Sequence, residues 1–367
     1  MNRTSVVIVG GGVSALYAAH LLEEAGLHDY MVLEARARLG GRLQAESAGE
    51  ARFDLGATWY WPDMQPQLDQ VVRLLGLRTF RQHEAGMMVF EQNATAPVHR
   101  FESLQGESAP SLRIDGGMTR LVDALAARVP GEKIRMGHVV RRIRLLDDTH
   151  SLVESVTDDG QVLPFLTQHV LLAMPPRLVV ERIGFEPPLP DPLAGAWADC
   201  PTWMAPHAKY LAVYPRPFWR AQGLSGSARS YAGPMVEIHD ASPADGMGAI
   251  FGFIGVPAAT RQSIPTEALM ALCRAQMGRL FGPEALSPTT EWLKDWSADP
   301  LTATSADTAS ASGHATAPQA AAEDGQWRGR ITGIASEWSS LFPGYVAGAI
   351  DAARDGAEAV LGYLMKR

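Results

Sequence analysis

The chain has 367 residues, enough for two domains and a large buried core. Hydrophobic residues make up 46% and charged residues 20%, as in globular proteins, and a net charge of −8 argues against nucleic acid or an anionic membrane as a partner. Two cysteines, Cys200 and Cys273, form neither a disulfide framework nor a C-x-x-C motif, so we expect a protein of the reducing cytoplasm.

Neither a secretion signal nor a membrane span is expected. The apolar run after Arg3 is interrupted by three glycines and lacks a convincing cleavage site, so a strand is the better interpretation. No segment reaches 18 consecutive apolar residues, and no hydrophobic tail follows the final helical stretch. These features predict a soluble protein.

The first part of the chain predicts a strand, a helix and a second strand. Val6 to Val9 is a short β-branched run suited to a strand buried on both faces. Val13 to Ala25 repeats apolar side chains at helical spacing, and Met31 to Leu33 forms a second apolar strand. This order is a βαβ unit, the structural context that a dinucleotide-binding fingerprint requires.

The fingerprint lies in the turn between the first strand and the helix. Gly10 makes the tight turn, and Gly12 lets backbone N–H groups at the helix N-terminus approach a pyrophosphate. Ala15, at the third position, lets helix and strand pack closely. Glu34 ends the second strand, where its carboxylate can accept from ribose hydroxyls. A purely structural turn is the alternative, and the complete unit favours a bound dinucleotide.

A second glycine turn follows the acid. Gly40, Gly41 and Arg42 form a further anion-binding turn, for which a loop with solvated arginines is the alternative. Together with the run from Phe53 to Ala57, this region resembles the flavoprotein amine oxidase family of the monoamine oxidase type. The resemblance implies a cofactor, FAD, with Arg42 near its pyrophosphate and the residues from Gly56 to Thr58 beside the flavin.

The rest of the chain matches the same family in pattern, with a G-G-M turn at 116–118 and an A-x-P-P end to the strand at 170–174. The resemblance implies a backbone contact from Val139 to the adenine. The complete set of cofactor-binding residues that it implies is Gly10, Gly12, Val13, Ser14, Ala15, Glu34, Ala35, Arg36, Gly41, Arg42, Gly56, Ala57, Thr58, Trp59, Val139, Glu337, Tyr345 and Val346.

Periodicity and turn residues predict the remaining elements. Helices are expected at 68–77, 119–128 and 266–281 and in the closing stretch to 364, and strands at 87–91, 98–101, 134–143, 170–174, 208–214, 250–256 and 331–335. Asp158 to Gly160 is expected to close a hairpin. The Ala/Ser/Thr-rich stretch 299–325 has few large apolar residues, so we expect a loose surface loop or lid there.

These elements predict an α/β protein with mixed α+β character. The expected fold is a Rossmann-like FAD-binding domain with a doubly wound parallel sheet, assembled from residues 1–62, 115–178 and 325–367. An inserted substrate domain with a mixed sheet would comprise residues 63–114 and 179–324. A cluster of prolines at 187–192 marks the exit from the cofactor domain.

Lys209 is the sharpest catalytic candidate. On its strand it shares a face with Leu211 and Val213, and the desolvation expected there lowers the pKa of a lysine. A lysine on a strand is more often an edge or snorkelling residue. The family resemblance aligns it with a lysine just ahead of a run like Pro217 to Arg220, and implies that it holds a water against the reactive nitrogen of the flavin.

The final segment resembles the closing signature of the family. The resemblance implies that Glu337 accepts from the ribityl or phosphate-linked groups of FAD and that Tyr345 forms an aromatic wall beside the flavin. The second wall has no evident source, because 302–326 contains no tyrosine or phenylalanine. His314 stands in that stretch, and the tryptophans that can fill the gap are Trp59, Trp61, Trp203 and Trp296. No cysteine occurs here, which implies that FAD is bound non-covalently.

The implied reaction is the oxidation of an amine to an imine and then an aldehyde, with oxygen as acceptor and hydrogen peroxide released. Two alternatives stay open: a related flavin oxidoreductase acting on an amino acid or a carbon–carbon bond, and a catalytically weak flavin-binding protein. An amino-acid oxidase needs an arginine for the substrate carboxylate, and Arg216 or Arg229 could serve. No H-x-H, H-E-x-x-H or G-x-S-x-G motif indicates a metal site or a serine nucleophile. The sequence indicates neither the particular amine nor the oligomeric state.

Overall fold

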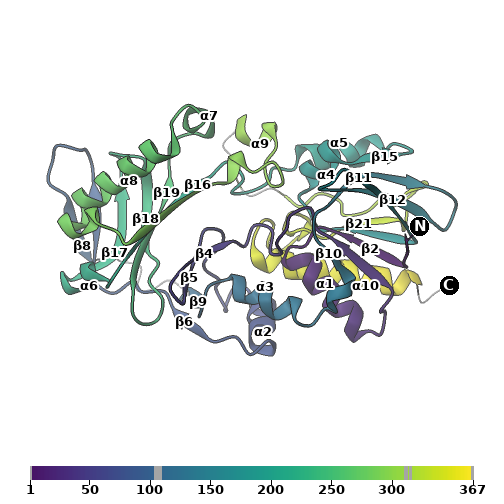
Figure 1. Ribbon diagram of the computed structural model, residues 1–367, viewed down its shortest axis with the longest axis horizontal. Coiled ribbons are helices and arrows are strands. Elements are labelled where there is room, and N and C mark those ends of the chain that lie inside the picture. The colour runs from purple at the N-terminus through teal and green to yellow at the C-terminus, as the bar shows by residue number, and fades with distance from the viewer. Residues whose placement is uncertain (1, 103–109, 310–312, 314–315, 365–367) are drawn as a thin grey trace.

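The structure is a computed structural model that describes residues 2–102, 110–309, 313 and 316–364. Two lobes lie side by side along the long axis of the molecule (Figure 1). One lobe, on the right in Figure 1, combines parallel strands with helices and carries both chain ends. The other is a large sheet with α8 packed on it. The predicted combination of an α/β lobe with a mixed-sheet lobe is confirmed.

A parallel five-stranded sheet forms the centre of the first lobe. Its strand order is β10-β3-β2-β14-β21, and all four pairings are parallel. The strands are β2 (Val6–Val9), β3 (Tyr30–Leu33), β10 (Ile134–Arg135), β14 (His169–Leu172) and β21 (Ile331–Gly333). With α1 (Val13–Glu24) between β2 and β3, the predicted strand–helix–strand unit is confirmed.

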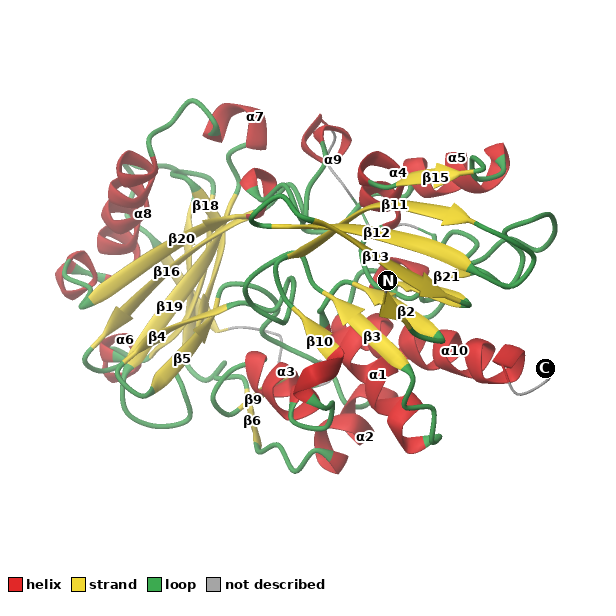
Figure 2. Ribbon diagram, turned by 45° about the vertical axis from the view of Figure 1, so that its right-hand side comes forward, coloured by secondary structure: helices red, strands yellow, loops and turns green. Residues whose placement is uncertain are grey.

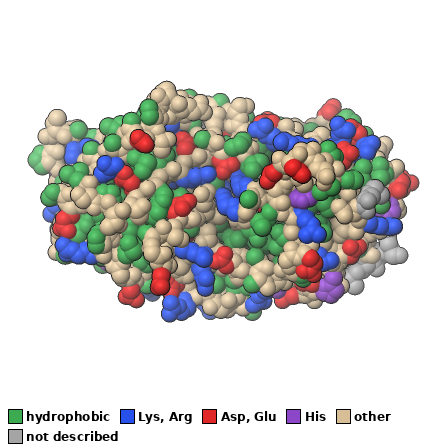
Figure 3. Space-filling view, in the orientation of Figure 1, with side chains coloured by type: hydrophobic (Ala, Val, Ile, Leu, Met, Phe, Trp, Pro, Cys, Tyr) green, Lys and Arg blue, Asp and Glu red, His purple; other side chains and the backbone are tan. Residues whose placement is uncertain are grey.

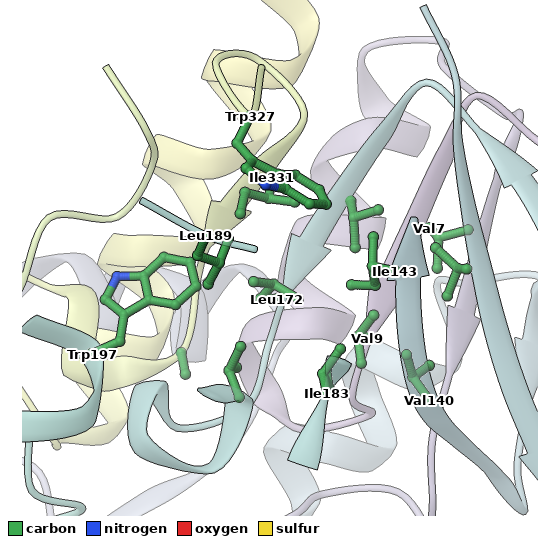
Figure 4. Close-up of a cluster of buried hydrophobic side chains, with 14 of the residues drawn as sticks. Val7, Val9, Val140, Ile143, Leu172, Ile183, Leu189, Trp197, Trp327 and Ile331 are labelled. Atoms are coloured by element: carbon green, nitrogen blue, oxygen red, sulfur yellow. The ribbon is translucent and has the colours of Figure 1, made fainter. Parts of the chain in front are cut away.

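Alternate residues of β2 are buried against different layers. Val6 and Ile8 pack against α1 and α10 (Val346–Leu364), whose small alanines allow the two helices to lie close to the sheet. Val7 and Val9 point to the opposite side, into a cluster with Trp197 and Trp327 (Figure 4). A strand covered on both faces must be continuously apolar, which is why the run is all valine and isoleucine.

A second five-stranded sheet covers the face of the parallel sheet opposite α1. Its order is β1-β13-β12-β11-β15. The strands are β1 (Asn2–Arg3), β11 (His138–Leu145), β12 (Ser151–Thr157), β13 (Val162–Thr167) and β15 (Gly184–Glu186). β12 and β13 form the hairpin predicted around Asp158 to Gly160. Apolar side chains of both sheets share one core with α4 (Pro176–Arg182) and α5 (Asp191–Asp199).

The second lobe is a seven-stranded mixed sheet of order β20-β16-β19-β18-β17-β7-β8. Its strands are β7 (Met87–Glu91), β8 (His99–Glu102), β16 (Ala208–Tyr214), β17 (Leu224–Ser230), β18 (Met235–Asp240), β19 (Gly248–Ile254) and β20 (Thr290–Asp295). Helix α8 (Thr266–Phe281) covers the outer face (Figure 2), against residues such as Tyr210 and Ile250. Leu211 and Phe251 lie on the inner face, against Phe53 and Leu55 of the first lobe.

Shorter elements complete the chain. Two antiparallel pairs are the hairpin of β4 (Ala45–Ala48) with β5 (Ala51–Asp54) and the pair of β6 (Thr79–Arg81) with β9 (Leu112–Ile114), which are far apart in the chain. The remaining α-helices are α2 (Pro66–Leu74), α3 (Thr119–Ala126), α6 (Phe218–Ala221), α7 (Ala258–Arg261) and α9 (Ser305–Ala309). In the part of the chain that the structure describes, no helix has both the length and the apolar character needed to cross a bilayer.

Two regions pack differently from the division expected from sequence. Residues 179–197 share a core with the parallel sheet, and α2 packs with α1 and α3. Because shared cores define domains, we propose that the cofactor domain includes α2 and continues to about residue 200, beyond the expected boundary at 178.

The described part of 299–325 is not the loose loop expected. Asp307 is fully buried and accepts hydrogen bonds from Arg177 and from the amide N–H of Thr202. Arg36 binds Asp299 and Thr302. Polar contacts to distant residues therefore fix a segment that lacks a large apolar core. His314 lies outside the described residues.

Candidate active site

A cavity of about 1130 Å³ extends from the glycine turns of the first lobe to β16 and β19 of the second. Small-molecule sites commonly enclose ~300–1,000 Å³, so this one has room for a large cofactor with a small substrate. Basic side chains gather near the middle of the molecule, between the two lobes (Figure 3). Arginines outnumber carboxylates among the described residues that line the cavity, which is therefore suited to an extended ligand that carries negative charge.

The two glycine turns lie against each other at one end of the cavity. Gly10 has φ +108°, and a Cβ there would stand 2.7 Å from the carbonyl oxygen of Ala173, so only glycine fits. Gly12 has φ −79° and caps α1, and a Cβ there would meet nothing within 4 Å. The amide N–H of Gly40 donates to the carbonyl of Gly11 at 2.9 Å, which joins the turns. The open face of Gly12 leaves the N-terminus of α1 accessible to an anion.

Glu34 is buried beneath these turns. One carboxylate oxygen accepts from the amide N–H of Gly11 at 2.5 Å and the other from the amide N–H of Arg36 at 2.7 Å. Each oxygen has a second lone pair, and Glu34 lines the cavity. Its carboxylate can therefore shape the glycine turn and still accept from a ligand hydroxyl.

Arg42 lines the cavity and is held by Glu337. The guanidinium donates to both carboxylate oxygens at 2.6 and 2.9 Å, and to Ser336 Oγ at 3.0 Å. Glu337 is 1% exposed and lies behind Arg42, outside the cavity wall. Its position supports an indirect role, in which the two-point contact fixes a cation that faces the ligand.

Lys209 lies at the other end of the cavity, on β16, and is 3% exposed. Its Nζ donates to Thr58 Oγ1 at 2.8 Å and to the carbonyl of Gly56 at 3.2 Å, and lies 3.8 Å from the ring centre of Phe251. Burial lowers the pKa of this lysine to about 7, despite attraction by Asp54. The amine is thus held against the segment expected beside the flavin, and its proton is easily lost.

Two buried charges near Lys209 were not identified as site residues from sequence. Asp54 accepts from the amide N–H of Met118 at 2.9 Å, and burial raises its pKa although Lys209 and Arg113 both lower it. Arg113 donates to the carbonyls of Ser242 and Ala241. Asp54, Arg113 and Lys209 come from three separate segments of the chain, so no local sequence motif contains all three.

The aromatic side of the cavity includes Tyr345 and four tryptophans, Trp59, Trp61, Trp203 and Trp296. The Trp203 ring stands beside Tyr345, with the ring centres 4.9 Å apart and the planes inclined by 46°. Gly344 backs this pair, since a Cβ there would lie 3.1 Å from Trp203 Cβ. Of the four candidates, Trp203 is therefore the neighbour of Tyr345.

Apart from Ala15 and Glu337, every residue named above as a cofactor or catalytic candidate lines this one cavity. Ala15 is fully buried where α1 meets the parallel sheet. The contacts of all these residues with FAD remain a prediction. Cavity residues that the sequence did not reveal include Glu237, whose strand β18 was not predicted, and Phe253, whose strand β19 was predicted without its neighbours in the sheet.

The first lobe has a parallel α/β fold, two adjoining glycine turns and a buried acid after its second strand. A large cavity extends from these turns to the second lobe. This combination is typical of enzymes that bind a dinucleotide. Residues 87–361 match the family described as flavin containing amine oxidoreductase, and residues 8–75 match an NAD(P)-binding Rossmann-like domain. The first match covers more than half of the chain, so the protein belongs to the flavin-containing amine oxidoreductase family.

Similarity to individual proteins extends over most of the chain. A probable flavin-containing monoamine oxidase A of Dictyostelium discoideum is 25% identical, over 94% of this chain and 95% of that protein. A putrescine oxidase of Kocuria rosea is 26% identical, over 81% of this chain and 83% of that protein. The structure of cyclohexylamine oxidase from Brevibacterium oxydans IH-35A superposes with a TM-score of 0.82 at 19% identity, covering 99% of this chain and all (100%) of that one.

FAD is accordingly the cofactor, and the protein is an FAD-dependent oxidoreductase that acts on amines. The residues present fit this group. The uncovered N-terminus of α1 at Gly12 and the fixed Arg42 suit a pyrophosphate, and Glu34 suits a ribose.

Proposed function

We propose that the protein oxidises an amine to an imine, which water hydrolyses to an aldehyde, with oxygen reduced to hydrogen peroxide. The observation that carries this proposal is that Lys209 and the glycine turns open into one cavity although they belong to different lobes. When bound, FAD supplies an acceptor for the two electrons that leave the substrate.

The residues of this chain orient the reactants in the proposed reaction. Tyr345 and Trp203 form an apolar wall that restricts the approach of the amine. Lys209, anchored by Thr58 Oγ1 and the carbonyl of Gly56, is placed to hold a water beside the reacting centre. A lysine pKa of about 7 means that its ammonium can pass a proton to a water or recover one near neutral pH.

Amines are favoured over amino acids by the arginines of the second lobe. Arg216 pairs with Glu284, and Arg229 pairs with Glu237. Neither of these two arginines lines the cavity. Arg261 does line it, but its guanidinium already donates to Asp295 and to the carbonyls of Val256 and Pro206. Among the described residues of this lobe, no cavity arginine is left over to bind a substrate carboxylate.

Non-covalent FAD is supported by the state of the two cysteines. Burial raises the pKa of both thiols, Cys200 and Cys273, to about 12, and neither lines the cavity. A protonated thiol is a poor nucleophile, so these side chains are unsuited to attack the flavin. Denaturation in acid is expected to release all of the flavin into the supernatant.

The proposed function is tested with protein reconstituted with FAD. Primary, secondary and tertiary amines are mixed with it anaerobically, and the flavin absorbance near its visible maximum is followed. At least one amine should bleach the flavin, and admission of air should restore the colour with one peroxide formed per aldehyde. Absence of bleaching across the panel would contradict the proposal and favour a flavin-binding protein without this activity.

A further inference from the structure

Three strands of the large sheet present Lys209, Phe253 and Glu237 in one row. In the register, Lys209 of β16 pairs with Phe253 of β19, and Phe253 pairs with Glu237 of β18. Residues directly opposite one another on antiparallel strands point to the same face. All three line the cavity. Adjacent strands are about 4.8 Å apart, so the backbones of Lys209 and Glu237 are roughly 10 Å apart, with an aromatic ring between them.

Glu237 stands out for its charge. Among the described residues that line the cavity, the carboxylates are Glu34 and Glu237, and Glu34 lies at the far end beside the glycine turns. Around Glu237 the wall is largely apolar and includes Val236, Ile254 and Val256. A carboxylate placed in such a wall offers a charged hydrogen-bond acceptor to a ligand in this part of the cavity.

The carboxylate of Glu237 stays ionised and keeps room for another partner. One oxygen contacts His239 Nε2 at 2.8 Å and the other accepts from Arg229 Nη1 at 2.9 Å. The hydrogen bond from His239 and the charge of Arg229 hold the pKa of Glu237 below its usual value. Each oxygen retains a lone pair, and the side chain is 32% exposed.

We infer that Glu237 binds a second, positively charged group of the substrate. The substrate class is then a flexible diamine, with the oxidised amino group at the Lys209 end, the methylene chain over Phe253 and the distal ammonium at Glu237. This inference rests on the proposed amine oxidation and adds a specificity-determining residue to it.

A simpler role must be distinguished from this one. Arg229 and Glu237 are directly opposite on β17 and β18, and such pairs can simply stabilise a sheet surface. The two roles make opposite predictions for the arginine. If Glu237 only stabilises the sheet, replacing either Glu237 or Arg229 has the same effect on the preference between diamine and monoamine. If Glu237 binds substrate, loss of Arg229 leaves the carboxylate in place with one competitor fewer.

The test compares wild-type holoenzyme with Glu237→Gln and Arg229→Gln. Peroxide release is measured with a straight-chain α,ω-diamine and with the monoamine of the same carbon number. We expect wild type to prefer the diamine. We expect the ratio of kcat/KM for diamine to that for monoamine to fall at least about tenfold in Glu237→Gln, through KM, because a hydrogen bond between charged groups is lost. Arg229→Gln should keep or increase the ratio.

Two results would overturn the inference. One is a wild-type enzyme that prefers the monoamine, which needs no variant to be folded. The other is a ratio that is unchanged in Glu237→Gln, or that falls equally in Glu237→Gln and Arg229→Gln. Failure of the proposed function is a separate outcome, since then neither amine would release peroxide from the wild-type protein.

Discussion

Replacing Gly12 by alanine should separate cofactor binding from folding. The backbone at Gly12, with φ −79°, is one that alanine adopts freely, and the added methyl group meets nothing within 4 Å. The change also restricts the unfolded chain, which typically stabilises a protein by about 0.4–1 kcal/mol. We therefore expect the apoprotein to be as stable as wild type or slightly more stable.

The affinity for FAD, in contrast, should decrease in Gly12→Ala. The methyl group would occupy the space through which a pyrophosphate reaches the N-terminus of α1. A hydrogen bond to a charged group contributes about 1.5–3 kcal/mol, so loss of one such contact corresponds to an affinity for FAD that is roughly 10- to 100-fold weaker.

Gly10 and Gly195 provide the matched comparisons. Alanine at Gly10 must adopt φ +108° with its Cβ 2.7 Å from a backbone oxygen, so it should destabilise the apoprotein by more than about 1 kcal/mol. Alanine at Gly195, in α5 with nothing within 4 Å of a Cβ, should change neither folding nor FAD affinity adversely. Urea unfolding of the apoproteins and titration of flavin fluorescence measure the two effects. Wild-type FAD affinity in Gly12→Ala, or a loss of stability equal to that of Gly10→Ala, would refute the reasoning.

Three further results are expected. Glu34→Ala removes the acceptor of two backbone amides in the cofactor turn and should yield protein with reduced flavin occupancy; full occupancy on purification would argue against the assignment. Lys209→Met should keep FAD bound but slow flavin reduction or reoxidation in stopped-flow measurements, and unchanged rates would remove the lysine from the mechanism. Burial lowers the pKa of His169 from 6.5 to about 4, so the unfolded state gains protons first and stability falls below pH 6.5. Protonation of His169 should contribute about 1.6 kcal/mol to the drop in unfolding free energy from pH 6.5 to 5, so this drop should be smaller by about that amount in His169→Gln than in wild type.

Local patterns predicted the fold well where the signal lies within one segment. The βαβ unit and the helix from Thr266 to Phe281 follow directly from apolar spacing and glycine turns, and the structure confirms both. The segment from 299 did not follow from composition, because Asp307 is fixed by Arg177, which lies far away in the chain. A stretch of small polar residues carries no sign of a distant partner.

The residues of the candidate site were also predictable only where the signal lies within one segment. Residues within motifs, such as Gly12 and Arg42, line the cavity where the motifs predicted a cofactor. Asp54 and Glu237 depend instead on which strands lie side by side. That pairing is set by sheet register, which shifts every side chain to the other face when it moves by one residue. Without strand order, the charge of Glu237 had no predicted position relative to Lys209.

The strand order of the parallel sheet has a consequence for biosynthesis. β21 pairs with β14, and α10 packs beside α1, so segments far apart in the sequence lie next to each other in the first lobe. A nascent chain that has emerged only as far as Arg330 lacks both the edge strand β21 and Glu337, the partner that fixes Arg42. The site for the flavin is therefore incomplete until the segment through Glu337 has been synthesised and has folded onto β14.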